Sequence, residues 1–379
     1  MTDAARREAA RLEAARIANL GAEEGDAWRR WAEEPAVAAV AKLWRDLLGR
    51  EPRVFDWLPQ RDEAAAWLNT DEAARAAGAP LAGPTPDCVR RVHDKAFALR
   101  VAAEERLTPE SLRDLVEILD PSDLEPAANA AARIESRAAG WPAWTGGRFT
   151  LKPRFGSSGR GRVGGRAGTG DPSALAGALP RLAKCGGAVL EPWLERTVDL
   201  SAQLAISRER GIVLLGTTTL LCDTSGVYRG HLATFDRKGG ATSGQPHDEP
   251  LREAAACVAV AAADAGLSGP CGVDGFAFRT GDGREELRPV CELNARYTAG
   301  TVALGFMRRH LERLKDGLDL AMEERGWFHF APTPPARGWP EPRPGEIVRI
   351  LLDPEAGEDG PALCASRDSA ALEIDAPLP

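Results

Sequence analysis

The 379-residue sequence is poor in lysine, tyrosine and methionine, and it has no long apolar run. Arginine supplies nearly all of the positive charge, and the lysines number only six: Lys42, Lys95, Lys152, Lys184, Lys238 and Lys315. A lysine inside a motif therefore points to function more strongly here than in an average sequence. Because no run reaches eighteen apolar residues, the sequence predicts no membrane-spanning helix.

Cysteine and charge narrow the class of protein further. The seven cysteines include no CxxC pair, which is typical of reduced thiols in a cytosolic protein. The net charge of −8 argues against a protein that binds nucleic acid or an anionic membrane through its bulk charge. The charged, helix-forming N-terminus lacks the apolar core of a signal peptide. We therefore expect a cytoplasmic location, with neither nucleic acid nor membrane as a partner.

The length indicates two or three domains. Residues 1–88 are expected to be mostly helical, with a short strand at 54–58 and a Pro/Gly connector at 78–88. The predicted units are a helical N-terminal domain (1–88), a lobe with a phosphate loop (89–195), a lobe with a metal-binding hairpin (196–330) and a Pro-rich C-terminal extension (331–379).

Within these units the local patterns alternate between helix and strand. One helix is predicted to open near Asp94, and a second, LTPESLRDLVEIL, to be capped by Thr108. A strand at 149–152 is followed by a glycine-rich loop, a helix at 173–184 and an apolar strand at 188–194. Three strand patterns, a long Ala/Val helix and a hairpin come next.

The hairpin carries the most informative residues. Asp274 lies in GVDGFAF and Glu292 in CELNAR, and the GDG between these two apolar strands is a strong hairpin signal. Alternation along a strand puts Glu292, Asn294 and Arg296 on one face. Two carboxylates and a carboxamide form an all-oxygen set of the kind that holds Mg²⁺, and Arg296 can grip an anion bridged to that metal. Solvated strand charges, or a structural ion pair of Arg296, are the alternatives.

A strand ending at Lys152 leads directly into a glycine- and serine-rich loop that begins Gly156, Ser157, Ser158, Gly159. Such residues let backbone N–H groups approach phosphate oxygens, and the lysine adds a point charge. The stretch GRGRVG matches G-x-G-x-x-G only literally, because no helix clearly opens at its last glycine. A flexible surface loop is one alternative. The other is a nucleic-acid patch built from Arg154, Arg160, Arg162 and Arg166, which the overall acidity disfavours.

EPWL ends the next apolar strand. The carboxylate of Glu191 can accept an amino-group proton there, and the backbone of the following residues can pair with an adenine edge. Asp199, eight residues on, can bind ribose hydroxyls. A core position for Trp193 and a solvated position for Asp199 are the alternatives.

Taken in order, these motifs resemble those of the ATP-grasp superfamily over residues 90–325. HDK at 93–95 resembles its first nucleotide-contacting lysine, LKPRFGSSGRG its second lysine and phosphate loop, and LEPWLER its adenine hinge. GVDGFAF with CELNAR resembles its metal-binding hairpin, and CELNAR is similar to the E-x-N-x-R of biotin carboxylase-like members. The combination of FTLKPRFGSSGRG and EPWL is similar to carboxylate–amine ligases.

The resemblance implies ATP held between two α+β lobes, with Mg²⁺ as the metal. Lys95 and Lys152 would hold the α- and β-phosphates, and the 156–165 loop would close over the γ-phosphate. The remaining implied roles are adenine binding by Glu191, Trp193 and Leu194, ribose binding by Asp199, and metal binding by Asp274, Glu292 and Asn294.

The chemistry expected of such a site is ligation of a small-molecule carboxylate to an amine. The carboxylate attacks the γ-phosphate, an amine displaces phosphate from the acyl phosphate, and Arg296 stabilises the oxyanion while Lys152 neutralises phosphate charge. A phosphotransferase and a non-catalytic nucleotide-binding protein are the alternatives. The substrates and the oligomeric state stay open, a homodimer being the commonest closed assembly.

Overall fold

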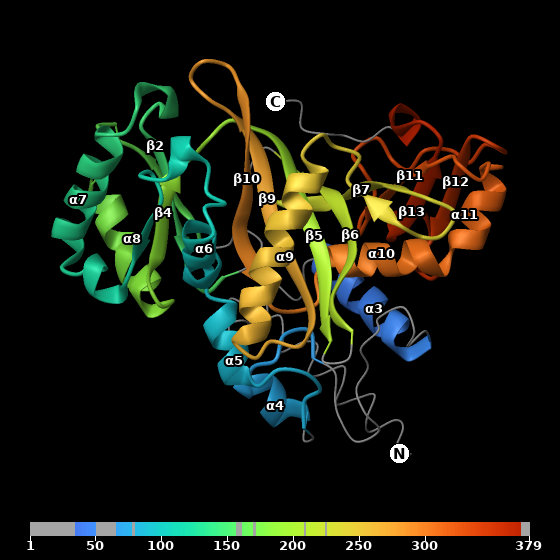
Figure 1. Cartoon of the computed structure of the whole chain (residues 1–379), viewed down its shortest axis with the longest axis horizontal. Helices are drawn as coiled ribbons and strands as arrows, with labels where there is room; N and C mark the ends of the chain where they lie inside the picture. The colour runs from blue at the N-terminus through green and yellow to red at the C-terminus, as the bar shows by residue number, and fades with distance from the viewer. Residues whose placement is uncertain are drawn as a thin grey trace.

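The computed structural model describes residues 35–50, 66–77, 80–156, 161–169, 172–207, 210–223 and 226–372. The strand predicted at 54–58 lies outside these residues. Two sheets organise the chain, and the helices gather around them (Figure 1). The fold is α+β, as the sequence predicts. No helix in the described ranges has both the length and the apolar character needed to cross a bilayer.

The smaller sheet lies in residues 110–195, which we call the small lobe. Its antiparallel order is β1 (Glu117–Leu119), β4 (Ala188–Pro192), β2 (Arg148–Pro153) and β3 (Val163–Arg166). Helices α7 (Ala127–Ala139) and α8 (Pro172–Lys184) pack against each other on its outer side (Figure 1). Their apolar faces and the buried sides of β2 and β4 form one core, which includes Ile134, Leu151 and Leu190.

One helix predicted for this lobe is wrong. The stretch LTPESLRDLVEIL forms a single 3₁₀ turn at Glu110–Leu112 and then the edge strand β1, with no helix capped by Thr108. β1 pairs with β4 through Glu117 and Leu190. Pairing with an exposed sheet edge supplies backbone hydrogen bonds that local helix propensity does not anticipate.

The larger sheet has the order β10-β9-β5-β6-β7-β11-β13-β12 within the described residues, and the short β8 (Ala241–Thr242) also pairs with β7. Adjacent strands are antiparallel throughout. The strand bounds are β5 (Arg196–Ser207), β6 (Gly211–Cys222), β7 (Tyr228–Phe235), β9 (Gly269–Arg279), β10 (Glu285–Asn294), β11 (Gly326–Ala331), β12 (Ile347–Leu351) and β13 (Ala362–Ser366).

The C-terminal residues belong to this sheet. β12 and β13 lie between residues 347 and 366, in the region that the sequence analysis treats as an extension, and β13 pairs with β11. Helices α9 (Asp248–Asp264), α10 (Ala299–Arg309) and α11 (Leu311–Gly317) complete this part of the molecule (Figure 1). α9 contacts β5, β6, β9 and β10, whereas α10 contacts β5, β6, β7, β9 and β13.

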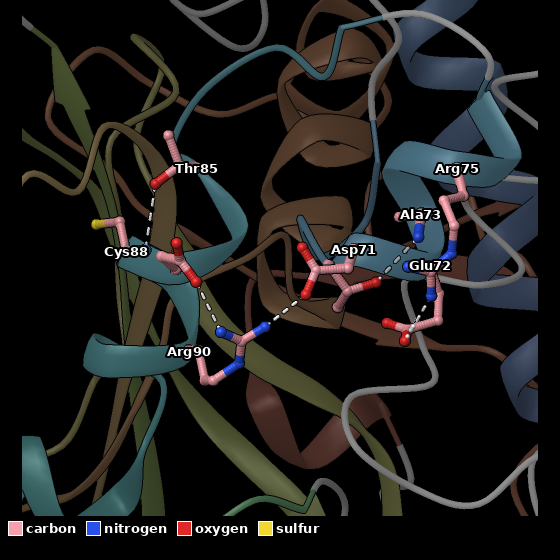
Figure 2. Close-up of polar contacts among 9 residues, drawn as sticks. Asp71, Glu72, Ala73, Arg75, Thr85, Cys88 and Arg90 are labelled. Carbon is pink, nitrogen blue, oxygen red and sulfur yellow. Dashed lines mark hydrogen bonds and ion pairs between the residues drawn. The ribbon is translucent and has the colours of Figure 1, made fainter.

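Four N-terminal helices pack on the larger sheet rather than on the small lobe. They are α3 (Pro35–Arg50), α4 (Asp71–Ala77), α5 (Pro86–Val92) and α6 (Lys95–Glu104), and their buried residues join the larger core. As predicted, α6 opens at Asp94, whose side chain accepts a hydrogen bond from the Ala96 N–H. Thr85 caps α5, and Arg90 joins that helix to α4 through an ion pair with Asp71 of 2.5 Å (Figure 2).

The β9–β10 hairpin links the two cores. Val273 and Leu293 lie in the larger core, whereas Phe276 and Phe278 lie in the core of the small lobe. Phe278 stacks on Trp144 of the small lobe, with ring centroids 6.2 Å apart. One hairpin therefore places its middle at the junction of the two lobes.

Candidate active site

A cavity of about 700 Å³ lies at this junction. Lys152, Gly156 and Trp193 line it from the small lobe. Strands β5, β6, β7, β9 and β10, with the start of α10, line it from the large sheet. Of the fourteen residues that the sequence predicts for the site, eleven lie in the described part of the chain. Nine of these line the cavity: Lys95, Lys152, Gly156, Trp193, Asp199, Asp274, Glu292, Asn294 and Arg296.

The predicted metal ligands meet on the hairpin. Glu292 lies directly opposite Asp274 in the β9–β10 register, and Asn294 lies opposite Gly272. The Asn294 side-chain N–H donates to Asp274 at 2.8 Å, and the Ser201 hydroxyl donates to the other oxygen of Asp274 at 2.5 Å. Within the described residues no three His, Cys, Asp or Glu side chains gather at one point. The set is therefore two carboxylates and one amide.

The electrostatics of the two acids differ. Burial, followed by the neighbouring charge of Glu292, raises the pKa of Asp274 to about 7. Burial would also raise the pKa of Glu292, but Lys95 and Lys152 outweigh it and lower that pKa to about 2. Like charges that face each other across a strand pair are destabilising unless a cation neutralises them. The pair thus has the charge and the oxygen donors that suit a divalent cation.

Each of the two predicted lysines forms an ion pair with a glutamate. The Lys95 ammonium lies 3.0 Å from Glu292 and donates to the Gly156 carbonyl at 2.7 Å. The Lys152 ammonium lies 2.5 Å from Glu191, whose second oxygen accepts from Arg288 at 2.7 Å. Glu191 and Arg288 are each 2% exposed. The two lysines therefore reach the cavity from α6 and β2 while compensating buried carboxylates.

Two arginines lie against the Trp193 ring at the end of the cavity where the sequence predicts adenine and ribose binding. The Arg162 guanidinium lies 4.1 Å from the centre of the Trp193 ring, and Arg196 lies 5.4 Å from the same ring. Arg196 also pairs with Asp199 at 2.6 Å. Trp193 offers an aromatic face to the cavity, so the core alternative for this side chain does not hold.

Arg296 lies just beyond the end of β10, next to the metal ligands. Its guanidinium donates to the Asn294 side-chain oxygen and to the Tyr297 carbonyl, each at 2.9 Å. The neighbouring His93 is buried, and its Nδ1 accepts from the Ala295 N–H at 3.3 Å. Burial, with Arg296 and Lys95 nearby, lowers the pKa of His93 to about 3, so this side chain adds no positive charge at neutral pH.

Two of the predicted residues that the structure describes do not line the cavity. Glu191 is buried beneath the cavity between Lys152 and Arg288, and Leu194 is buried in the core of the small lobe. Ser157, Ser158 and Gly159 lie outside the described residues. A direct contact of the Glu191 carboxylate with a base would require that it release Lys152 or Arg288.

Several residues of the site escape sequence reasoning. Ser201 and Gln203 follow Asp199 at intervals of two on β5, so strand alternation could have revealed them. Gln203 is fully buried and donates to Ser201 at 2.7 Å. Arg288 and Trp67 carry no local signal, because their partners lie far away in the sequence.

Comparisons with known proteins find matches among solved structures. No protein-family model and no curated protein sequence matches the chain. Among solved structures, N5-carboxyaminoimidazole synthase from Aspergillus clavatus, in complex with ADP and 5-aminoimidazole ribonucleotide, is 14% identical with a TM-score of 0.47, covering 80% of this chain and 76% of that one. Biotin carboxylase from Campylobacter jejuni is 14% identical with a TM-score of 0.44, covering 75% and 64%.

D-alanyl-alanine synthetase A from Vibrio cholerae is 12% identical with a TM-score of 0.44, covering 69% of this chain and 84% of that one. All three structures have TM-scores below 0.5 to this chain. At such identities an activity does not transfer, so the function has to be argued from this chain's own residues.

Proposed function

We propose that the protein is an ATP-dependent ligase that joins a carboxylate to an amine, releasing ADP and phosphate. One observation carries the proposal. A single cavity between two lobes is lined by two lysines, a hairpin with two carboxylates and an amide, and an arginine beside them. Phosphoryl transfer needs aligned reactants and neutralised phosphate charge, and these side chains supply both.

The oxygen donors of Asp274, Glu292 and Asn294 suit Mg²⁺. When bound, Mg²⁺ would neutralise charge on the β- and γ-phosphates. Lys95 already contacts Glu292 at 3.0 Å, so this ion pair has to lengthen as the carboxylate turns to the metal. Lys95 is then free to face a phosphate oxygen.

In this proposal Lys152, Trp193 and Asp199 bind the nucleotide. Lys152 projects into the cavity from the end of β2 and adds positive charge next to the glycine-rich loop. Trp193 offers its ring to the adenine, and Asp199 offers a carboxylate to the ribose. In this proposal Glu191 holds Lys152 in place rather than contacting the base.

Arg296 faces the reacting carboxyl group. The acid's oxygen attacks the γ-phosphorus and ADP leaves, giving an acyl phosphate. The amine then attacks the carbonyl carbon, the C–O bond to phosphate breaks, and the amine loses a proton. Arg296 stabilises the oxyanion of the tetrahedral state, because its half-buried guanidinium lies in the cavity next to the proposed metal ligands.

The proposal is tested by trapping the activated acid. Purified protein is incubated with ATP, Mg²⁺, hydroxylamine and one of a panel of acids, and both ADP and hydroxamate are measured. The expected result is an acid-dependent hydroxamate formed in a one-to-one ratio with ADP. A stable phosphorylated product would favour the phosphotransferase. ATP binding without turnover of any acid would favour a non-catalytic nucleotide-binding protein.

A further inference from the structure

The cavity continues past Arg296 to a wall supplied by the N-terminal part of the chain. Ala36, Val40 and Ala41 of α3 line it, together with Trp67. None of these four side chains carries a charge. This end of the cavity therefore differs from the end with the lysines and the carboxylates.

Aromatic packing attaches this wall to Arg296. The Tyr297 N–H donates to the Trp67 carbonyl at 3.2 Å, and the Arg296 guanidinium lies 6.0 Å from the centre of the Trp67 ring. Trp44 of α3 meets Trp67 edge to face, with ring centroids 5.5 Å apart. A ligand whose carboxyl group faces Arg296 therefore has its remaining atoms next to α3.

Hydrogen-bond donors of Arg296 remain at the point where it meets the wall. Arg296 has five N–H donors, and the described residues accept from two of its nitrogens. A carboxylate has the acceptor oxygens that such donors need, and a buried donor without a partner is costly.

The charged side chain that follows the wall residues in α3 pairs with acids outside the cavity. Lys42 follows Ala41 directly, but it is exposed and its ammonium lies 2.6 Å from Asp353 and 3.2 Å from Glu355. The described α3 residues that line the cavity, Ala36, Val40 and Ala41, therefore all have apolar side chains. An apolar group placed there gains free energy from leaving water, whereas a charged one loses hydration without finding a partner.

We propose that the acid activated at this site carries an apolar substituent, which packs on α3 while its carboxylate faces Arg296. This inference rests on the proposed ligase function and adds a substrate class to it. It makes Ala41 and Val40 specificity-determining residues.

The test compares acids in the hydroxamate assay. Two series are used: glycine, alanine, valine, leucine, phenylalanine, aspartate and lysine, and acetate, isovalerate and 3-phenylpropionate. We expect kcat/KM to rise with apolar size, roughly fourfold for each buried methylene, which corresponds to about 0.8 kcal/mol. Aspartate and lysine should be the poorest amino acids.

Paired variants then locate the preference. Ala41→Asp should lower kcat/KM for the favoured apolar acid by at least about tenfold, because it puts a charge at the wall. Ala38→Asp is the matched control, since Ala38 is exposed on the same helix and does not line the cavity. Ala41→Leu keeps the wall apolar but fills it, and should penalise the largest acids while leaving small ones nearly unaffected.

Three results would overturn the inference. A preference for aspartate or lysine, or equal effects of Ala41→Asp and Ala38→Asp on apolar acids in folded proteins, would contradict it and leave the ligase function standing. If Ala41→Asp does not fold, an Ala41→Leu variant with unchanged acid selectivity contradicts it equally. Failure of every acid to give hydroxamate would instead overturn the ligase function, and the inference with it.

Discussion

At the level of single residues, the site consists of acids and cations that compensate one another. Lys95 holds Glu292, and Lys152 holds Glu191. Opposite charges that are buried together avoid the cost of an unpaired charge. In the proposed function, binding of phosphates and a metal would exchange partners among these groups.

Removing the charge of one of these acids or lysines should abolish most of the turnover. We expect Glu292→Gln and Lys152→Ala each to lower kcat by at least roughly a hundredfold, because each removes electrostatic stabilisation of phosphoryl transfer. The measurement is ADP release in the presence of the best acid. Glu286→Gln on the same strand and Lys238→Ala on the surface are the controls, and near-normal rates in both site variants would contradict the assignment.

The lowered pKa of Glu191 predicts that the free energy of unfolding depends on pH. Burial alone would raise its pKa, but Arg288 and Lys152 outweigh burial and hold the pKa well below the ordinary value of 4.5. A lowered pKa stabilises the fold above about pH 4.5, and that stabilisation is lost as the pH falls below this value. Glu191→Gln should cost about 3–5 kcal/mol at neutral pH, because it leaves the buried Arg288 and the partly buried Lys152 with less compensation.

Urea unfolding of the wild type and Glu191→Gln between neutral pH and pH 3.5 measures this effect. The gap between the two midpoints should narrow below about pH 4.5, because Glu191 of the unfolded wild type takes up a proton there while Glu191 of the folded protein stays ionised. A gap that stays constant over this range would show that the charge of Glu191 does not stabilise the fold.

At the level of elements, a bulge in β10 sets the alignment of the metal ligands. The register shifts between Arg288 and Glu292, and this shift puts Glu292 opposite Asp274. Gly275 lies against the bulge, where an added Cβ would come within 2.7 Å of the carbonyl oxygens of both Arg288 and Pro289. Because these are backbone atoms, they cannot move away without disturbing the strand.

Gly275→Ala should therefore destabilise the protein by about 1–3 kcal/mol and lower its affinity for Mg²⁺ together with its activity. Thermal unfolding and the Mg²⁺ dependence of turnover provide the measurements. The control is Gly177→Ala in α8, where an added Cβ meets nothing within 4 Å and should be neutral or slightly stabilising. Unchanged stability and unchanged Mg²⁺ dependence in Gly275→Ala would contradict this role of the bulge.

The sequence was informative where local patterns are strong. The hairpin followed from the GDG turn and the alternation around Asp274 and Glu292, and α6 followed from its cap at Asp94. β3 was missed because Val163–Arg166 contains two glycines, which are rare in strands. It forms because β2 offers it backbone partners.

Long-range contacts explain the other omissions. Trp67 and α3 reach the cavity from a region whose composition shows only helix, and their partner Tyr297 lies about 230 residues away. The sequence assigns Glu191 to adenine binding and gives no sign of its ion pair with Arg288, because Arg288 comes from another strand of another sheet. Such pairings depend on the whole fold and not on any local pattern.

At the level of the whole molecule, two cores meet at one cavity. The small lobe has its own core, and the hairpin adds Phe276 and Phe278 to it. A ligand that contacts both lobes should therefore stabilise the folded protein as a unit. Binding at about 100 times the dissociation constant contributes about 2.7 kcal/mol.

We expect ATP with Mg²⁺ to raise the melting temperature, and ATP with EDTA to raise it much less, because Asp274 and Glu292 then repel the phosphates. Differential scanning fluorimetry measures both shifts. The Glu292→Gln variant should show a smaller difference between the two conditions. An equal shift with and without Mg²⁺ in the wild type would contradict the metal assignment.

The central claim is that an acid is activated as an acyl phosphate, and isotope transfer tests it most directly. The best acid is labelled with ¹⁸O in both carboxylate oxygens and turned over with ATP, Mg²⁺ and hydroxylamine, and the released phosphate is analysed by mass spectrometry. The account predicts one ¹⁸O atom in each phosphate, because the oxygen that attacks the γ-phosphorus leaves with it. Unlabelled phosphate, or a phosphorylated product that releases no phosphate, would contradict the account.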